Sequence, residues 1–181
     1  MTGPATPPAV TISPMRRRHL RAVLRIETQV YPTPWSMQLY LGELDSTEGR
    51  TYKVARSGQK VVGYGGLMYV VDEAHVTTLA VHPEHQGHRI GARILLELTR
   101  EAIAKGMTAL TLEVRASNLA GQALYRRFGL VPAGIRRGYY REVDEDAIIM
   151  WAEEIDGPAY GARLDAIEAG LAGAPARGGT P

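Results

Sequence analysis

The chain has 181 residues, a formal net charge of +2 and no cysteine. This length suits one domain with a sizeable core, and the lack of cysteine excludes disulfides, thiolate zinc sites and a cysteine nucleophile. The nearly balanced charge offers no electrostatic argument for binding nucleic acid. No apolar run is long enough to span a bilayer, and the first ten residues, MTGPATPPAV, lack the basic start and apolar core of a signal peptide. We therefore expect a cytoplasmic protein with no membrane partner and no direct nucleic-acid partner.

Both ends of the chain carry few large apolar side chains. Residues 1–8 and 172–181 are rich in Pro, Gly, Ala and Thr, so burial there is too small to offset the entropy lost on ordering. We expect these ends to be flexible. Between them we expect a single domain with its core at about residues 9–153, followed by a C-terminal helix at 160–171.

In the first third of the chain the hydrophobic period changes several times. Residues 10–13 predict a short strand, and residues 16–30 predict an amphipathic helix that ends before a Tyr-Pro pair. Ser36 is a suitable N-cap for a second short helix, in which we expect Leu39 and Leu44 to face inward.

The rest of the chain alternates strand and helix patterns. A hairpin turn is expected at residues 57–59, and Gly106 is expected to end the long helix in the middle of the chain. The predicted strands are 51–57, 60–72, 75–81, 108–114, 130–140 and 146–154, and the predicted helices are 89–105 and 116–129. This order gives a mixed α+β fold with one strand–helix–strand crossover, and we expect the last two strands to be antiparallel.

The turn between the strand at 75–81 and the helix at 89–105 carries the sequence QGHRIG, residues 86–91. Such a turn directs unpaired amide groups to solvent at the positive end of a helix dipole, where phosphate oxygens bind. Gly87 and Gly91 allow close approach because neither has a Cβ. From the glycines alone, an ordinary turn without a ligand explains the pattern equally well.

The same residues resemble the cofactor signature of the GNAT superfamily of acetyl-CoA-dependent N-acetyltransferases, Gln/Arg-x-x-Gly-x-Gly/Ala. Gln86 and Gly91 match it, whereas Arg89 stands where the signature has its first glycine. An arginine at that position is strained if its φ is positive and tolerable if its φ is helical. Its cation also suits a phosphate.

The resemblance extends over residues 9–152. Within that superfamily the sequence is similar to the bacterial ribosomal-protein alanine N-acetyltransferases. It is carried by TLEVRASNLAGQALYRRFGLVPAGIRRGYY at 111–140, EDAIIM at 145–150 and YPTPWS at 31–36. The resemblance implies the GNAT fold, a central twisted mixed sheet flanked by helices, with splayed central strands that form the acetyl-CoA cleft. It also implies acetyl transfer from acetyl-CoA to the N-terminal α-amine of a protein, the N-terminal alanine of a small-subunit ribosomal protein.

The resemblance assigns the catalytic roles to Glu113 and Tyr125. Glu113 is implied as the general base, and Tyr125 as the general acid that protonates the departing CoA thiolate. A carboxylate base suits an α-amine, whose pKa of about 7.7–8.0 lies well below the value of about 10.4 for lysine. The simpler alternatives are a solvent-facing Glu113 paired with Arg115, and a Tyr125 that only packs in the core. No acyl-enzyme is expected, since the chain has no cysteine and no serine in a recognisable nucleophile turn.

Further residues are implied to bind the two substrates. Asn118 lies two helical turns before Tyr125, so the two share one face, and the resemblance gives Asn118 a contact to the coenzyme. The strand backbone at 79–81 is implied to pair with the pantetheine arm, as an added strand would. The implied coenzyme-binding residues are Leu79, Ala80, Val81, Gln86, Gly87, His88, Arg89, Ile90, Gly91, Ala92 and Asn118, and the implied substrate-binding residues are Trp35, Tyr139 and Tyr140.

Histidines near the loop raise the alternative of a metal site. His82, His85 and His88 are three apart, a spacing that converges on zinc only in a helix. Pro83 and the glycines favour a loop, so we expect no metal. Two functional alternatives stay open. One is a GNAT that acts on lysine, a polyamine or another small-molecule amine such as an antibiotic, and the other is a domain that binds acyl-CoA without catalysis.

Overall fold

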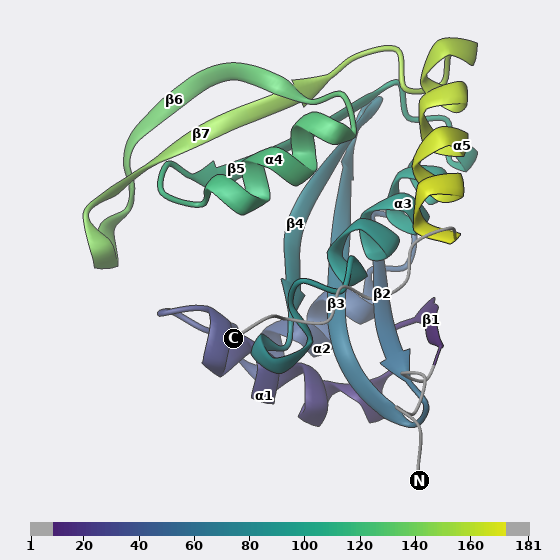
Figure 1. Cartoon of the computed structure of the whole chain (residues 1–181). Coiled ribbons are helices and arrows are strands. Elements are labelled where there is room, and N and C mark those ends of the chain that lie inside the picture. The colour runs from purple at the N-terminus through teal and green to yellow at the C-terminus, as the bar shows by residue number, and fades with distance from the viewer. Residues whose placement is uncertain (1–8, 173–181) are drawn as a thin grey trace, which may run out of the picture.

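One mixed sheet runs through the computed structural model, which describes residues 9–172 of the chain (Figure 1). Within these residues the sheet has seven strands in the order β1-β2-β3-β4-β5-β7-β6. They are β1 (Val10–Pro14), β2 (Arg50–Ser57), β3 (Lys60–Val70), β4 (Glu73–Val81), β5 (Ala109–Arg115), β6 (Val131–Tyr140) and β7 (Glu145–Ala152). The helices are α1 (Leu20–Val30), α2 (Met37–Asp45), α3 (Ile90–Ala104), α4 (Leu119–Arg127) and α5 (Pro158–Ala172), with short 3-10 turns at Arg17–His19, Pro83–His85 and Arg141–Val143.

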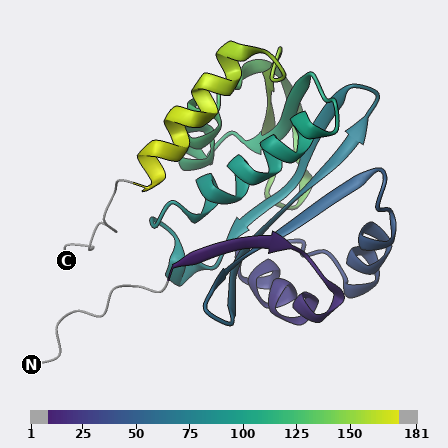
Figure 2. The same cartoon turned by 90° about the vertical axis from the view of Figure 1, so that its right-hand side faces the viewer.

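The sheet carries helices on both faces, and each face has its own core (Figure 2). On the face covered by α1 and α2, the buried cluster includes Tyr40 and Tyr64. On the face covered by α3, α4 and α5, it includes Leu95. The neighbours Val54 and Ala55 of β2 belong to different clusters, as the two-residue period of a strand requires.

The central strands β4 and β5 pair in parallel over only three residue pairs, from Glu73 with Ala109 to His75 with Thr111. Beyond them β4 stays with β3 as far as Val81, while β5 pairs with β7 (Figure 1). The two strands therefore diverge toward their carboxyl ends. α3 connects the two strands and forms the predicted strand–helix–strand crossover. The splayed central strands implied by the resemblance are also present.

One extra residue in β4 changes the direction of its side chains. Two adjacent residues of β3 pair with Val76 and Thr78, so Thr77 between them has no partner in the ladder. Val76 belongs to the core on the α3 face, whereas Ala80 belongs to the core on the α1 face. In a regular strand these two residues would face the same side, so Thr77 is a β-bulge that reverses the alternation.

Most predicted elements are confirmed, with bounds that differ by a few residues. Ser36 caps α2 as expected, because its side-chain oxygen accepts a hydrogen bond from the Leu39 amide at 3.2 Å. The inward position predicted for Leu39 is wrong, since this residue is 42% exposed and Tyr40 beside it is fully buried. Tyr40 faces inward because its hydroxyl donates to the buried carboxylate of Glu27, and one residue turns a helix by about 100°.

The C-terminal helix α5 is slightly longer than predicted and buries one side against the sheet and α3. The flexible end predicted to begin at residue 172 is wrong at Ala172, which is helical because Leu171 beside it is buried in the core. The other residues predicted to be flexible, 1–8 and 173–181, lie outside the described residues. None of the helices in residues 9–172 is both long and apolar enough to cross a membrane.

The close packing of β2 on β3 at Gly66 provides a test of the fold. A Cβ at this position would overlap the ring of Tyr52, which is buried and held by a hydrogen bond of 2.6 Å from its hydroxyl to Glu43. Gly66→Ala is therefore expected to lower the free energy of unfolding by about 2–3 kcal/mol in urea titrations.

The matched control is Gly42→Ala in α2, where nothing lies within 4 Å of an added Cβ. It is expected to raise the free energy of unfolding by about 0.5–1 kcal/mol, since alanine favours a helix more than glycine does. A Gly66→Ala variant as stable as the parent protein would show that the Tyr52 ring moves aside freely, contrary to the packing described.

Candidate functional site

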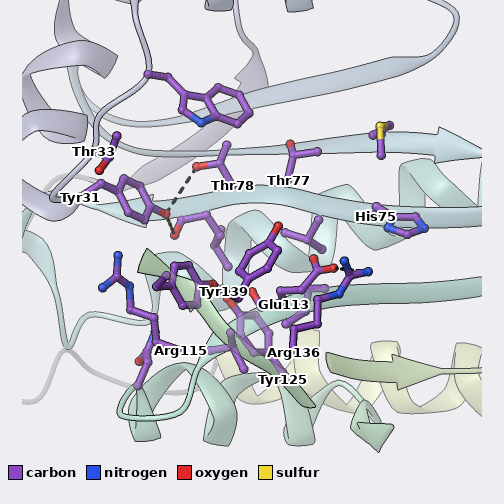
Figure 3. Close-up of a pocket in the computed structure, with 18 of the residues that line it drawn as sticks. Tyr31, Thr33, His75, Thr77, Thr78, Glu113, Arg115, Tyr125, Arg136 and Tyr139 are labelled. Carbon is purple, nitrogen blue, oxygen red and sulfur yellow. Dashed lines mark hydrogen bonds and ion pairs between the residues drawn. The ribbon is translucent and has the colours of Figure 1, made fainter. Parts of the chain in front are cut away.

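A cavity of about 600 Å³ lies where β4 and β5 diverge (Figure 3). Its wall is formed by residues of α1, β4, β5, α4 and β6, which come from widely separated parts of the sequence. The structure brings seven of the predicted site residues to this wall: Trp35, Leu79, Glu113, Asn118, Tyr125, Tyr139 and Tyr140.

Glu113 projects into the cavity from β5, and its side chain is 24% exposed. The residues on either side of it are buried, so the alternation of the strand directs its carboxylate to the opening. Oε1 lies 3.3 Å from a guanidinium nitrogen of Arg136 on β6. Arg115, the partner considered from the sequence, pairs instead with Glu142 and Glu145 at 3.5 and 4.0 Å.

Tyr125 reaches the same cavity from α4 and is 8% exposed (Figure 3). Burial raises the pKa of its phenol above the usual value of 10.0, and the phenols of Tyr31 and Tyr140 nearby raise it further. The Tyr125 hydroxyl therefore stays protonated at neutral pH and is available as a hydrogen-bond donor in the cavity.

Asn118 and Tyr125 both line the cavity, as their seven-residue spacing predicts. Asn118 is the N-cap of α4, and its side-chain oxygen accepts a hydrogen bond from the Gly121 amide at 2.8 Å. This bond occupies the oxygen, so the side-chain NH₂ group of Asn118 is the part that can donate to a ligand.

Aromatic side chains also line the cavity. The rings of Tyr139 and Tyr140 meet edge to face with centroids 5.2 Å apart, and the guanidinium of Arg115 lies 4.4 Å from the Tyr140 centroid. Burial raises the pKa of Tyr140 to about 12, against an opposing effect of Arg115. Trp35 borders the cavity from the segment between α1 and α2, with its ring 5.3 Å from that of Tyr40.

A buried carboxylate that sequence reasoning missed supports the Trp35 side of the cavity. Glu27 of α1 is 2% exposed and accepts hydrogen bonds from the Tyr40 hydroxyl at 2.9 Å, the Trp35 amide at 3.0 Å and the Tyr64 hydroxyl. These bonds fix the segment between α1 and α2 against β3. The sequence contained one indication that Glu27 is buried. Glu27 lies one helical turn after the apolar Val23, on the buried face of α1.

Two backbone carbonyls of β4 face away from β3. The Tyr31 hydroxyl donates to the carbonyl of Leu79 at 3.0 Å (Figure 3). The side-chain amide of Gln86 donates to the carbonyl of Val81 at 3.1 Å. The amide and carbonyl of one residue in an antiparallel pair point to the same side, so the amides of Leu79 and Val81 also face away from β3. By the same alternation the backbone of Ala80 faces β3, and its side chain is buried.

The loop before α3 lies outside the cavity wall and is open to solvent at residues 86–89. Gly87 has a φ of +79°, and Arg89, the N-cap of α3, has a φ of +61°. The sequence left open a strained, positive φ and a tolerable, helical φ for Arg89. The positive φ is observed, and it is strained because this left-handed region favours glycine. The helical φ that would relieve the arginine is not adopted.

The backbone amides of residues 87–91 donate to no acceptor in the part of the chain that the structure describes. They surround the N-terminus of α3, where unpaired amides and the helix dipole favour an anion. The side chains of Ile90 and Ala92 are buried, so these two residues offer only backbone groups to a ligand.

The histidines near this loop bond mainly to local groups. Nδ1 of His82 accepts a hydrogen bond from the Glu84 amide at 3.2 Å, and the rings of His82 and His85 meet edge to face. Nδ1 of His88 lies 2.9 Å from the carbonyl of Gln86. Over residues 9–172, no three His, Cys, Asp or Glu side chains are placed to hold a metal ion.

Diverging parallel strands, a loop with unpaired amides at the next helix, and a carboxylate and a phenol in one cavity are features of a known class of protein. The chain belongs to the acetyltransferase (GNAT) family, whose sequence pattern matches residues 20–130. The family predicted from the sequence is thereby confirmed.

Within this family the chain is similar to ribosomal protein bS18-alanine N-acetyltransferase of Escherichia coli (strain K12), with 37% identity over 145 residues that cover 77% of this chain and 95% of that protein. It is also 37% identical over 147 residues to the N-alpha-acetyltransferase RimI of Mycobacterium tuberculosis, covering 78% of this chain and 90% of that protein. The crystal structure of the ribosomal-protein-S18-alanine N-acetyltransferase from Escherichia coli matches with a TM-score of 0.74 and 34% identity, over 81% of this chain and 94% of that chain. The predicted fold class is confirmed as well.

Proposed function

We propose that this protein transfers the acetyl group of acetyl-CoA to the N-terminal α-amine of a protein, and that its acceptor is the N-terminal alanine of a small-subunit ribosomal protein. The single observation that carries the proposal is that Glu113 and Tyr125 line one cavity from β5 and α4, at the point where β4 and β5 diverge. The names of its relatives support the choice of acceptor. The protein is proposed to act as one domain in the cytoplasm, without a metal.

In this proposal acetyl-CoA binds along the edge of β4 and over the loop before α3. The pantetheine amides pair with the backbone groups of Leu79 and Val81. They replace the side chains of Tyr31 and Gln86, which donate to those two carbonyls in the structure. The pyrophosphate is bound by the amides of residues 87–91. Support for this placement comes from the direction of the β4 carbonyls and from the free amides at the start of α3.

The chemistry is a direct attack of the acceptor amine on the thioester carbonyl. A C–N bond forms and the C–S bond breaks, so the amine loses one proton and the CoA thiolate gains one. Glu113 accepts the proton of the amine, directly or through a water molecule, and Tyr125 donates to the departing sulfur. A cleft-facing amide of β4 stabilises the charge that develops on the carbonyl oxygen.

The acceptor is proposed to enter between Trp35 and the pair Tyr139 and Tyr140, whose rings border the cavity. An α-amine is mainly a cation below its pKa of about 7.7–8.0, and it gives one proton to solvent before it attacks, because only the neutral amine is a nucleophile. It replaces Arg136 as the partner of Glu113, since Arg136 is 54% exposed and free to turn toward solvent. Asn118 donates to the coenzyme through its side-chain NH₂.

The test is incubation with acetyl-CoA and a panel of acceptors, followed by fragmentation mass spectrometry to locate the added acetyl group. The panel contains peptides with a free N-terminal alanine, N-terminally blocked peptides with an internal lysine, and a polyamine. Acetyl is expected on the N-terminal nitrogen. Acetyl found only on lysine side chains or on the polyamine would overturn the proposed acceptor, and coenzyme binding without transfer to any acceptor would favour a non-catalytic domain.

The pH profile of kcat/KM gives a further prediction. The profile is expected to rise with a midpoint near pH 8 and to level off about one pH unit higher as the acceptor amine loses its proton, because its pKa is about 7.7–8.0. Since Tyr125 acts in its protonated form and burial raises its pKa above 10.0, the plateau is expected to continue to about pH 10. A descending limb below pH 10 that disappears in Tyr125→Phe would show that Tyr125 loses its proton in this range, contrary to the raised pKa.

A further inference from the structure

The C-terminal end of α5 lies against the N-terminal turn of α3, next to the loop with the free amides (Figures 1 and 2). A guanidinium nitrogen of Arg89 donates to the carbonyl of Gly170 at 2.9 Å, and Arg93 one turn further along donates to the carbonyl of Leu171 at 2.8 Å. The last carbonyls of an α-helix have no partner inside the helix and carry its negative end. The two arginines therefore satisfy groups that α5 leaves unpaired.

The position of these carbonyls is fixed by the packing of α5. Its apolar side is buried in the core shared with α3 and α4, through Tyr160, Leu164, Ile167 and Leu171. The Tyr160 hydroxyl donates to the carbonyl of Phe128 at 2.7 Å. On the solvent side Arg100 of α3 binds both oxygens of Glu168 at 2.9 and 2.7 Å. Both faces of α5 are thus tied to α3 and to the C-terminal end of α4.

Arg89 needs such support because of its backbone conformation. Its φ of +61° and ψ of +18° lie in the left-handed region, which an L-residue with a Cβ adopts reluctantly and glycine adopts freely. With Gly87 also at positive φ, these two residues set the direction of the free amides at positions 87–91. An Arg89 that relaxed to a negative φ would turn some of those amides away from a common ligand.

We infer that α5 holds the coenzyme loop in its binding conformation through Arg89, although α5 itself contacts no coenzyme. This inference rests on the proposed function, in which the loop binds the pyrophosphate of acetyl-CoA. Arg89 is a positioning residue in this account, because its side chain is engaged by Gly170 and acts through the backbone of the loop. The affinity for coenzyme therefore depends on how well the last turn of α5 is docked.

The experiment measures the Kd for coenzyme A by isothermal titration calorimetry in four full-length variants. Leu171→Asn loosens the last turn of α5, since Leu171 is 3% exposed, and it is expected to raise the Kd about five- to ten-fold. Ala169→Asn is the matched control, because it introduces the same side chain at an exposed position of the same turn. Its Kd is expected to stay within about two-fold of the parent value.

Arg89→Gly supplies the decisive comparison. Glycine adopts a positive φ without help and keeps the backbone amide, so the Kd of this variant for coenzyme A is the reference value for the double variant. Leu171→Asn added to Arg89→Gly is expected to change the Kd by less than about two-fold, because the loop then needs no support from α5. In steady-state assays Leu171→Asn is expected to raise KM for acetyl-CoA and to leave kcat at saturation unchanged, and the double variant is expected to have the same KM as Arg89→Gly alone.

A Kd that rises as much in the double variant as in Leu171→Asn alone would overturn the inference, as would equal effects of Leu171→Asn and Ala169→Asn. If Leu171→Asn unfolds at the assay temperature by circular dichroism, Arg93→Met replaces it, since this change removes only the bond to Leu171. The effect of Arg93→Met on the Kd should likewise disappear when it is combined with Arg89→Gly. If Arg93 contacted the phosphate directly, its effect on the Kd would remain in that combination. A parent protein that binds no coenzyme A would defeat the proposed function, and this inference with it.

Discussion

Glu113→Gln is expected to lower kcat by about 10²–10⁴-fold, the range lost when a general base is removed. Glutamine keeps the size of the side chain but cannot take the proton of the attacking amine. The Kd for coenzyme A is expected to stay within about two-fold, because the carboxylate faces the acceptor side of the cavity next to Arg136. Steady-state kinetics with an alanine-initiated peptide and calorimetry with coenzyme A measure the two quantities separately.

The comparison for this variant is Glu142→Gln, which removes another carboxylate from the wall of the same cavity. Glu142 pairs with Arg115 at 3.5 Å, so its loss changes the charge of the cavity but removes no proposed base. Its effect on kcat is expected to be below about ten-fold. Equal losses for the two variants would show that the negative charge of the cavity matters and that proton transfer to Glu113 does not.

Tyr125→Phe is expected to lower kcat by about 10²-fold, at the lower end of the range for general acid catalysis. The ring stays in place, so the packing of α4 is kept, and only the donor to the departing thiolate is lost. Since the buried phenol remains protonated throughout the assay range, the deficit is expected to be the same at pH 7 and pH 9. Single-turnover measurements with bound acetyl-CoA separate this loss from any change in affinity.

A suitable control is Tyr69→Phe, which removes a phenol of β3 that bonds to Thr51 at 2.7 Å outside the cavity. Its kcat is expected to equal that of the parent protein. A Tyr125→Phe variant with full activity would assign Tyr125 to packing alone, the simpler reading of its place beside the core residue Phe128.

Much of the fold follows from local sequence patterns. The helical period of residues 89–105, the glycine after it and the flanking apolar strands were enough to predict the crossover and the loop at its start. The seven-residue spacing of Asn118 and Tyr125 was enough to place both on one wall of the cavity. Regular elements repeat a short period, so a single sequence carries this information.

The parts that were missed depend on contacts between distant residues. Glu27 is buried because two phenols, one of them 37 residues away, donate to it, and no local pattern reports such partners. Tyr40, rather than Leu39, is the buried residue of α2 because its hydroxyl bonds to the distant Glu27. Arg89 reaches a carbonyl 81 residues further along the chain, which a pattern of glycines and charges around the loop does not reveal.

The unpaired Thr77 determines the phase of the second half of β4. Because successive peptide groups of a strand point in opposite directions, deleting one residue here would exchange inward and outward groups from Thr78 to Val81. The carbonyls that now receive Tyr31 and Gln86 would then turn to β3, and Ala80 would offer its backbone to the cavity instead. The number of residues in this strand is therefore constrained more tightly than the identity of any one of them.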